Sequence, residues 1–298
     1  MQILYGTASR NIDVTAICLS HLRTGNIVTI PPGDHARANY FTDPNPGVLK
    51  SVFVILNSSM QEYDVTLTVL LDVLHLTVST LQSVDGRVDA KINDLHRKLK
   101  IAYGTFQEEL YEQRMAVRFL TGNEKVLELG GNIGRNSLII ASLLNTSDSF
   151  VCMESDSQIA EQLRENRDTN GFNFGIENSA LSKRKLIQVG WNTVPSEVLL
   201  PGYKWVNTIT FEELNKKYNI KFDTLVLDCE GAFYFILQDM PEVLQNINLI
   251  LMENDYTDIT HKQFIDKVLR NSGFQRIYHE AGGWGVCYDF FFETWRKV

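Results

Sequence analysis

Residues 126–134 read Val126-Leu127-Glu128-Leu129-Gly130-Gly131-Asn132-Ile133-Gly134. The first four residues form a short apolar run that is typical of a buried strand, and the glycines after them predict a tight turn into a helix. Because glycine lets the backbone approach a ligand closely, we expect Gly130, Asn132 and Gly134 to contact a bound cofactor. The alternative is a plain strand-to-helix turn without a ligand.

An acidic residue follows the glycine turn at the sequence separation that is typical of a ribose-binding carboxylate. The next apolar run ends at Met153-Glu154, about 20 residues after the turn, where a carboxylate can accept hydrogen bonds from both ribose hydroxyls. The turn lacks the glycine spacing of a dinucleotide site, and Glu128 would repel a pyrophosphate. Glu128 suits a cationic ligand instead. A cofactor with a ribose and a positive group is S-adenosylmethionine.

Apolar runs and amphipathic helices alternate on both sides of this turn. The patterns predict strands at 126–129, 150–153, 174–177, 224–227 and 249–252, and helices at 133–144, 157–170 and 260–271. Two last strands, 274–279 and 286–294, must be antiparallel because the loop between them is too short for a crossover helix. The order predicts an α/β fold with a mostly parallel sheet that is covered by helices on both faces.

The N-terminal part has a different pattern. Short apolar runs between proline- and glycine-rich turns predict a small β-rich domain at residues 1–85, and linking helices are predicted at 86–120. The α/β domain then occupies residues 121–298. The β-rich domain carries no catalytic constellation, so we expect an accessory role, in homo-oligomer formation or in glycan recognition.

Composition and charge narrow the class of protein. Net charge is −8, and the first hundred residues hold 9 basic and 9 acidic side chains, which leaves 19 basic against 27 acidic in the remainder. An acidic catalytic part disfavours a nucleic-acid substrate. No apolar stretch is long enough for a membrane span, and the scattered cysteines suggest neither zinc nor disulfides. We therefore expect a cytoplasmic protein with no membrane partner.

Four motifs in order resemble the FkbM family of S-adenosylmethionine-dependent O-methyltransferases, over roughly residues 105 to 294. They are 128–134, Glu154, Leu227-Asp228-Cys229-Glu230-Gly231 and Met252-Glu253. The resemblance implies a Rossmann-like class I methyltransferase whose seven-stranded sheet ends in an antiparallel pair. It also implies an adenine contact at Asn178 and Ser179, and a sugar or small-metabolite hydroxyl as the acceptor.

The sequence departs from the family pattern at several positions. Glu128 stands where an aspartate is usual and Ser155 where a proline is frequent, and neither change is expected to matter for cofactor binding. Val226 and Phe233 stand where a lysine and a glutamate are common, so no mechanism is expected to depend on those two groups. Two alternatives stay open. The chain could be a binding protein that keeps the fold without activity, or a methyltransferase for an acceptor that is not a sugar.

Methyl transfer to a hydroxyl requires a group that positions the acceptor oxygen and takes its proton. Asp228, Glu230 and Glu253 follow the middle strands and are the first candidates, and Asp228 is also a candidate cofactor contact. His279 is a further candidate base, and Trp284 could stack on a sugar ring or seal the core. A divalent metal on these acids is conceivable but is not favoured by their spacing.

Overall fold

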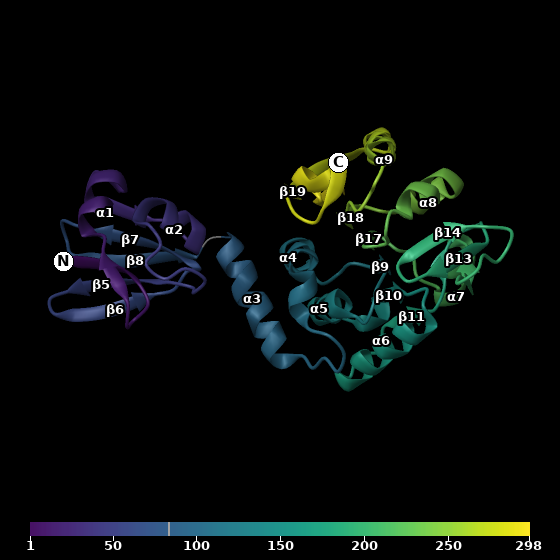
Figure 1. Cartoon of the computed structure of the whole chain (residues 1–298), viewed down its shortest axis with the longest axis horizontal. Coiled ribbons are helices and arrows are strands. Elements are labelled where there is room, and N and C mark those ends of the chain that lie inside the picture. Colours follow the sequence, from purple (N-terminus) through teal and green to yellow (C-terminus); the bar gives the residue numbers. More distant parts are fainter. Residues whose placement is uncertain (83) are drawn as a thin grey trace. The chain divides into compact units, whose positions relative to one another are not determined.

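The computed structural model describes residues 1–82 and 84–298, and its contacts divide the chain into two units (Figure 1). The first unit is Met1–Asp94 and the second is Leu95–Val298. The division falls inside helix α3 (Val84–Lys98), so this helix begins in one unit and ends in the other. Residues 95–120, expected to be part of a linker, therefore belong to the second unit.

Two antiparallel four-stranded sheets, in the orders β2-β1-β5-β6 and β3-β4-β7-β8, make up most of the first unit. Their strands are β1 Gln2–Gly6, β2 Asn11–Asp13, β3 Arg23–Thr24, β4 Ile27–Ile30, β5 Ser51–Leu56, β6 Ser59–Tyr63, β7 Leu67–Asp72 and β8 Thr77–Gln82. Ile3 and Val54 of one sheet share a hydrophobic core with Val28 and Val69 of the other. The β-rich character predicted for this part is confirmed.

Two short helices of the first unit were not predicted. Helix α1 (Thr15–His21) buries only Cys18, and α2 (Asp34–Phe41) buries Arg37 and Phe41. A helix with one or two buried positions shows no apolar periodicity in its sequence. The buried Arg37 guanidinium donates hydrogen bonds to three backbone carbonyl groups, so a charged residue occupies a core position of α2.

The second unit is built on one seven-stranded sheet in the order β11-β10-β9-β17-β18-β20-β19. Its strands are β9 Val126–Leu129, β10 Phe150–Met153, β11 Gly175–Glu177, β17 Thr224–Leu227, β18 Leu249–Glu253, β19 Phe274–Glu280 and β20 Phe292–Lys297. Neighbouring strands from β11 to β18 are parallel, whereas β20 is antiparallel to both β18 and β19. This is the Rossmann-like sheet of class I methyltransferases, so the predicted fold class is confirmed.

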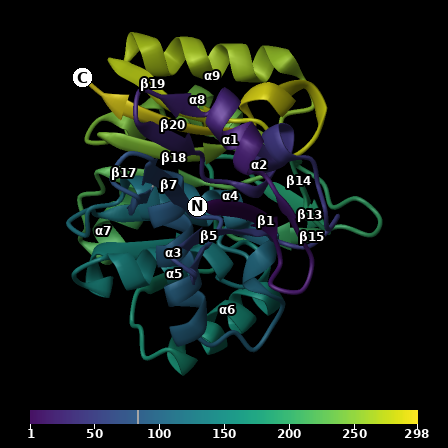
Figure 2. The ribbon, with the colours of Figure 1, turned by 90° about the vertical axis from the view of Figure 1, so that its left-hand side faces the viewer.

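Helices cover this sheet and bury its central strands. They are α4 Leu110–Phe119, α5 Arg135–Leu143, α6 Ser157–Thr169, α7 Phe211–Tyr218, α8 Phe233–Asp239 and α9 Ile259–Asn271. Helix α4 packs beside α5, and α8 packs beside α9, as Figure 1 shows. In Figure 2, α9 runs along β19, against which it packs. All residues of β9, β10 and β17 are buried, because the sheet centre is covered on both faces. Within residues 1–82 and 84–298, no helix combines the length and apolar character needed to cross a bilayer.

The last strand differs from the prediction. Residues Gly285–Phe290 form the 3₁₀ helix η4, and β20 begins only at Phe292, whereas a strand was predicted over 286–294. The cause is Asn254, whose backbone N–H donates to the Phe291 carbonyl at 2.7 Å and whose side chain donates to the Phe290 carbonyl at 2.8 Å. These bonds satisfy the two carbonyl groups outside a β ladder.

A small antiparallel sheet between β11 and α7 was also not predicted. It consists of β13 (Leu186–Val189), β14 (Asn192–Pro195) and β15 (Lys204–Val206), and beside it β12 (Ala180–Leu181) pairs with β16 (Thr208–Ile209). The signal for it is the two-residue hairpin turn Gly190-Trp191, in which Gly190 has φ +56°.

Candidate cofactor site

A cavity of about 170 Å³ lies at the carboxyl ends of β9, β10 and β17. Its wall begins with the turn after β9, continues through the loops after β10 and β11 and through β13 and β14, and ends with α8. In an open parallel sheet, ligands bind at this edge, where the loops after neighbouring strands meet. All lining residues lie between Leu129 and Met240, and therefore in the second unit.

The glycine turn forms one wall of the cavity and is held by its own hydrogen bonds. The backbone N–H groups of Gly130 and Gly131 donate to the Met153 carbonyl at 3.0 and 2.9 Å. The next N–H, that of Asn132, donates to the Glu154 carboxylate at 3.0 Å. Further along, the Ile133 N–H donates to the Asn132 side chain at 2.8 Å. Because these amides are engaged within the protein, the turn offers no ready cradle for a phosphate group.

Glu154 lines the cavity as predicted. Besides the Asn132 amide, its carboxylate accepts a hydrogen bond from the Asp156 N–H at 2.7 Å, and the residue is 7% exposed. Burial raises the pKa of Glu154 above its ordinary value, although the backbone donors of Asp156 and Asn132 oppose this shift. Each carboxylate oxygen keeps a second lone pair for a ligand. The side chain is thus fixed in place and still able to accept hydrogen bonds.

The predicted adenine contacts are separated by the structure. Ser179 lines the cavity and donates a hydrogen bond to Glu177 at 3.1 Å. Asn178 lies behind the wall, where its side-chain amide donates to the backbone carbonyl groups of Glu154 at 2.8 Å and Ser155 at 3.2 Å. Asn178 therefore supports the loop that carries Glu154 and does not line the cavity.

Glu128 and Gly134 also lie behind the turn and do not line the cavity. The Glu128 carboxylate is 3% exposed and accepts hydrogen bonds from the hydroxyl of Ser137 and from the side-chain amide of Asn136 at 3.3 Å. Gly134 caps the start of α5 with φ +94°, and a Cβ there would lie 2.5 Å from Leu163. The structure therefore places the Glu128 carboxylate away from the cavity, and its contact with a cationic ligand stays a prediction. A strand residue just before a turn can point to either face of the sheet, and this one points at α5.

The burial of Glu128 has a measurable effect on stability. Desolvation raises the pKa of Glu128 from 4.5 to about 7. Because the folded-state pKa is the higher one, wild-type stability from this group is lost as pH rises from 4.5 through 7, by up to roughly 3 kcal/mol. We expect Glu128→Gln to remove this loss. The free energy of unfolding of the variant minus that of the wild type, both measured in urea, should therefore increase by up to that amount between pH 4.5 and pH 8.

The matched control is Glu161→Gln, on the exposed surface of α6, whose difference from the wild type should not depend on pH. A Glu128→Gln difference that is equally flat from pH 4.5 to 8 would contradict a raised pKa for Glu128.

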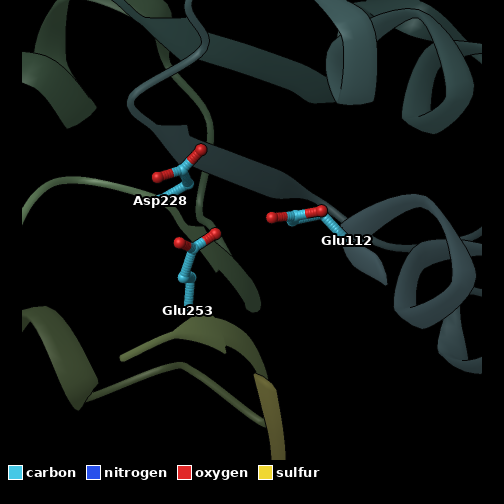
Figure 3. Close-up of side chains that lie close together, drawn as sticks. All are labelled: Glu112, Asp228 and Glu253. Atoms are coloured by element: carbon cyan, nitrogen blue, oxygen red, sulfur yellow. The ribbon is translucent and has the colours of Figure 1, made fainter. Parts of the chain in front are cut away.

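The acids predicted at the strand ends are brought together. Asp228 and Glu230 line the cavity, and Glu253 lies beside Asp228 at the end of the neighbouring strand β18. The sequence analysis did not find Glu112 of α4, which reaches the same place (Figure 3). Glu112 shares a helix face with the buried residues Met115 and Ala116, and an acid on the apolar face of a helix is the signal that could have found it.

Burial and mutual repulsion dominate the electrostatics of this group. Burial, together with the charges of Glu109 and Glu112, raises the pKa of Asp228 well above its usual range. Burial, the hydrogen-bonding contact with the Glu112 carboxyl and the charge of Asp228 raise the pKa of Glu253 in the same direction. Raised values make these carboxylates stronger bases when they are ionised.

Glu230 occupies a strained backbone position at the cavity. Its φ of +50° lies in the left-handed region, which long side chains rarely adopt. The next N–H, that of Gly231, donates to the Asp255 carboxylate at 2.8 Å and holds the loop in this conformation. Strain of this kind is often found at functional sites, and here it turns the loop after β17 along the cavity wall.

The other two predicted residues lie elsewhere. His279 is exposed on β19, the edge strand of the sheet, and Trp284 is 51% exposed in the loop before η4. Neither residue lines the cavity. The prediction placed His279 near the cleft because it ends a strand beside the Trp284 loop, but two strands, β18 and β20, separate β17 from β19.

The far side of the cavity has an apolar part beside the paired Arg184 and Asp239. Leu181, Ile236 and Met240 are buried there, and Trp191 of the β13–β14 turn stands at the wall with 57% of its surface exposed. A flat apolar surface with an aromatic side chain at its rim can pack against an aromatic ring such as a purine. Trp191 was missed because the small sheet that carries it was not predicted.

The sequence matches no family model and no curated protein. Similar solved structures include a ribosomal protein L11 methylase from Lactobacillus delbrueckii subsp. bulgaricus, with 14% identity, 66% of this chain and 82% of that chain covered, and a TM-score of 0.42. An O-methyltransferase from Bacillus cereus in complex with SAH has 15% identity, coverage of 73% and 92%, and a TM-score of 0.40. An rRNA methylase from Streptococcus thermophilus has 9% identity, coverage of 64% and 95%, and a TM-score of 0.39. By its own strand order, with β20 reversed at the end of a parallel sheet, the second unit has the class I methyltransferase fold.

Proposed function

We propose that this chain is an S-adenosylmethionine-dependent O-methyltransferase that acts on a hydroxyl group of a sugar or glycan. The observation that carries the proposal is the placement of Glu154, whose buried carboxylate is held by two backbone amides at the cavity beside the glycine turn. A carboxylate fixed in this way can accept hydrogen bonds from the ribose hydroxyls without losing side-chain entropy on binding.

The acids at the cavity favour a cationic cofactor over a dinucleotide. Asp228 and Glu230 line the wall, and the backbone amides of Gly130, Gly131 and Asn132 already donate within the protein, so a pyrophosphate would lie beside acidic groups without these backbone donors. Arg184 also lines the cavity, but its guanidinium is paired with the Asp239 carboxylate through two hydrogen bonds. The apolar side around Trp191 then suits the adenine ring.

The remaining acids have a role in the transfer itself. When bound, the cofactor supplies a methyl group on a sulfonium. The acceptor oxygen forms its bond to the methyl carbon as the carbon–sulfur bond breaks and leaves its electron pair on sulfur, while the hydroxyl proton passes to a base. Asp228, Glu230 and Glu253 are the candidate bases, because they lie at the strand ends beside the cavity. Several carboxylates in one place also suit a sugar, which offers several hydroxyl donors.

The departures from the family pattern at Val226 and Phe233 do not remove groups from the cavity. Val226 is 4% exposed in β17, and Phe233 is fully buried at the start of α8, and both belong to the hydrophobic core. Their side chains contribute packing where the family pattern has charges. An inactive binding protein would still take up the cofactor, so a turnover assay separates it from an enzyme.

The cofactor assignment is tested by Glu154→Ala. Removing a charged hydrogen-bonding partner of a buried ribose costs about 1.5 to 3 kcal/mol, so we expect the affinity for S-adenosylhomocysteine to fall more than tenfold. Isothermal titration calorimetry measures the dissociation constant directly, and circular dichroism shows whether the variant is folded.

Glu161→Ala is the matched control, because Glu161 lies on the outer surface of α6, the helix that follows the Glu154 loop. Its dissociation constant should equal that of the wild type. If folded Glu154→Ala also binds as tightly as the wild type, the cofactor assignment is wrong.

A further inference from the structure

Three carboxyl groups from three separate elements converge beside the cavity. Glu112 comes from α4, Asp228 from the end of β17 and Glu253 from the end of β18. One oxygen of each lies within 4.8 Å of the others, and Figure 3 shows the three side chains pointing toward one another. Oxygens on opposite sides of a Mg²⁺, Mn²⁺ or Ca²⁺ ion are separated by about 4 to 5 Å, since each lies roughly 2.0 to 2.6 Å from the metal. The spacing therefore fits a single cation between them.

This group consists of acids. Among the residues that the structure describes, no lysine, arginine or histidine forms an ion pair with Glu112, Asp228 or Glu253. The arginine of the nearby α5, Arg135, is paired with Glu108 and Glu109 instead. Buried like charges without a counter-charge are costly, and this repulsion accounts for part of the raised pKa values of Asp228 and Glu253.

Glu112 provides a second, independent indication of a ligand. The residue is 8% exposed, and its Oε2 atom is buried and accepts a hydrogen bond from no amide, hydroxyl or cationic group in the described part of the chain, while its carboxyl is in hydrogen-bonding contact with another acid, Glu253. A buried carboxylate oxygen normally has a donor, and one without a donor needs an explanation such as a bound ion. Since α4 places this side chain on its buried face and aims it at Asp228 and Glu253, a cation between the three groups would satisfy the unpaired oxygen.

From this geometry we propose that Glu112, Asp228 and Glu253 bind a divalent cation. The three ligand groups are all carboxylates, with no histidine or cysteine among them, and oxygen-only ligands of this kind suit hard ions such as Mg²⁺, Mn²⁺ or Ca²⁺. Its role rests on the proposed function. Asp228 also lines the cofactor cavity, and a cation there would hold the acceptor hydroxyl and lower its pKa.

The test is a titration of the full-length chain with MnCl₂ after dialysis against EDTA, with no cofactor present. We expect one Mn²⁺ to bind per chain, detected by calorimetry and by loss of the free-ion signal in electron paramagnetic resonance. Glu112→Gln keeps the shape of the side chain but removes its charge, and it should weaken Mn²⁺ binding at least tenfold. Glu161→Gln, an exposed acid that takes no part in the group, should bind as the wild type does.

A second variant keeps the test decisive if Glu112→Gln does not fold. Glu253→Gln removes a ligand from a different element and should weaken Mn²⁺ binding by a similar factor. The proposal is overturned if the wild type binds no Mn²⁺, or if folded Glu112→Gln and Glu253→Gln both bind it as the wild type does. If the wild type binds no Mn²⁺, the charges of the three carboxylates would have to be neutralised by shared protons or by the ammonium group of the cofactor.

Failure of this inference is distinguishable from failure of the proposed function. S-adenosylhomocysteine is titrated into the wild type in the presence of EDTA. Cofactor binding without Mn²⁺ binding overturns the cation site alone, whereas Mn²⁺ binding without cofactor binding overturns the proposed function. If both bind, methyl transfer should stop with EDTA and return with excess Mg²⁺, and transfer at full rate in EDTA would contradict a role for the cation.

Discussion

Asp228→Asn is expected to lower the rate of methyl transfer by a factor of about 10² to 10⁴ while changing the affinity for S-adenosylhomocysteine little. Asp228 lines the cavity at the end of the strand that pairs with the glycine-turn strand, and it belongs to the converging carboxylates. An amide of the same shape cannot take the hydroxyl proton, and because it is uncharged it is a weaker ligand for a divalent cation, so both proposed roles of this residue are impaired together.

The same substitution should not unfold the protein. Because burial and neighbouring acids raise the pKa of Asp228, its charged form is disfavoured in the folded state, and a neutral side chain relieves that cost. A lower rate in a variant at least as stable as the wild type would locate the effect in catalysis. The measurement is single-turnover transfer of a labelled methyl group to a panel of free and nucleotide-linked sugars.

Three companion variants complete this experiment. Glu230→Gln and Glu253→Gln should also lower the rate, whereas His279→Ala should not, because His279 is exposed on the edge strand and does not line the cavity. Wild-type rates in Asp228→Asn, Glu230→Gln and Glu253→Gln would show that these acids are not the base. Methylation of a peptide or nucleic acid, with every sugar inert, would show that the acceptor class is wrong.

The sequence predicted the parts of the site that depend on local chain geometry. The strand, the glycine turn and Glu154 follow one another within about 30 residues. In a parallel sheet the carboxyl ends of neighbouring strands lie at one edge, independently of the conformation of the loops. Asp228 and Glu253 could be placed for the same reason, since each directly follows or ends a short apolar strand.

The site residues that the sequence misplaced or missed depend on the direction of side chains, on packing between distant elements and on very short strands. Glu128 lies one residue before a residue that lines the cavity, yet it points to the other side, because successive side chains of a strand face opposite ways. Glu112 is distant in sequence from Asp228, and only the packing of α4 against β18 brings them together. Trp191 belongs to the small sheet β13–β15, whose strands have three or four residues, too few for a clear alternating pattern.

The turn that opens the site tolerates no side chain at its first glycine. Gly130 has φ +88°, and a Cβ there would lie 1.6 Å from the backbone oxygen of Asp228. This is far inside van der Waals contact, and the atom it meets is backbone, which cannot move aside as a flexible side chain can. The Asp228 N–H donates to the Leu129 carbonyl at 3.0 Å, so separating the two segments would also break a hydrogen bond between β9 and β17.

Gly130→Ala is therefore expected to destabilise the fold by more than about 3 kcal/mol, or to prevent soluble expression, because left-handed strain of roughly 1 to 2 kcal/mol adds to the backbone collision. Gly171→Ala is the matched control. Gly171 has a similar φ of +70°, but no atom lies within 4 Å of a Cβ built there, so only the strain should be seen. The difference between the two free energies of unfolding, measured in urea, isolates the close approach of the turn to β17. Equal losses in the two variants would mean that the turn and the end of β17 can separate freely. In that case the wall shared by Gly130 and Asp228 would not be a fixed part of the cofactor site.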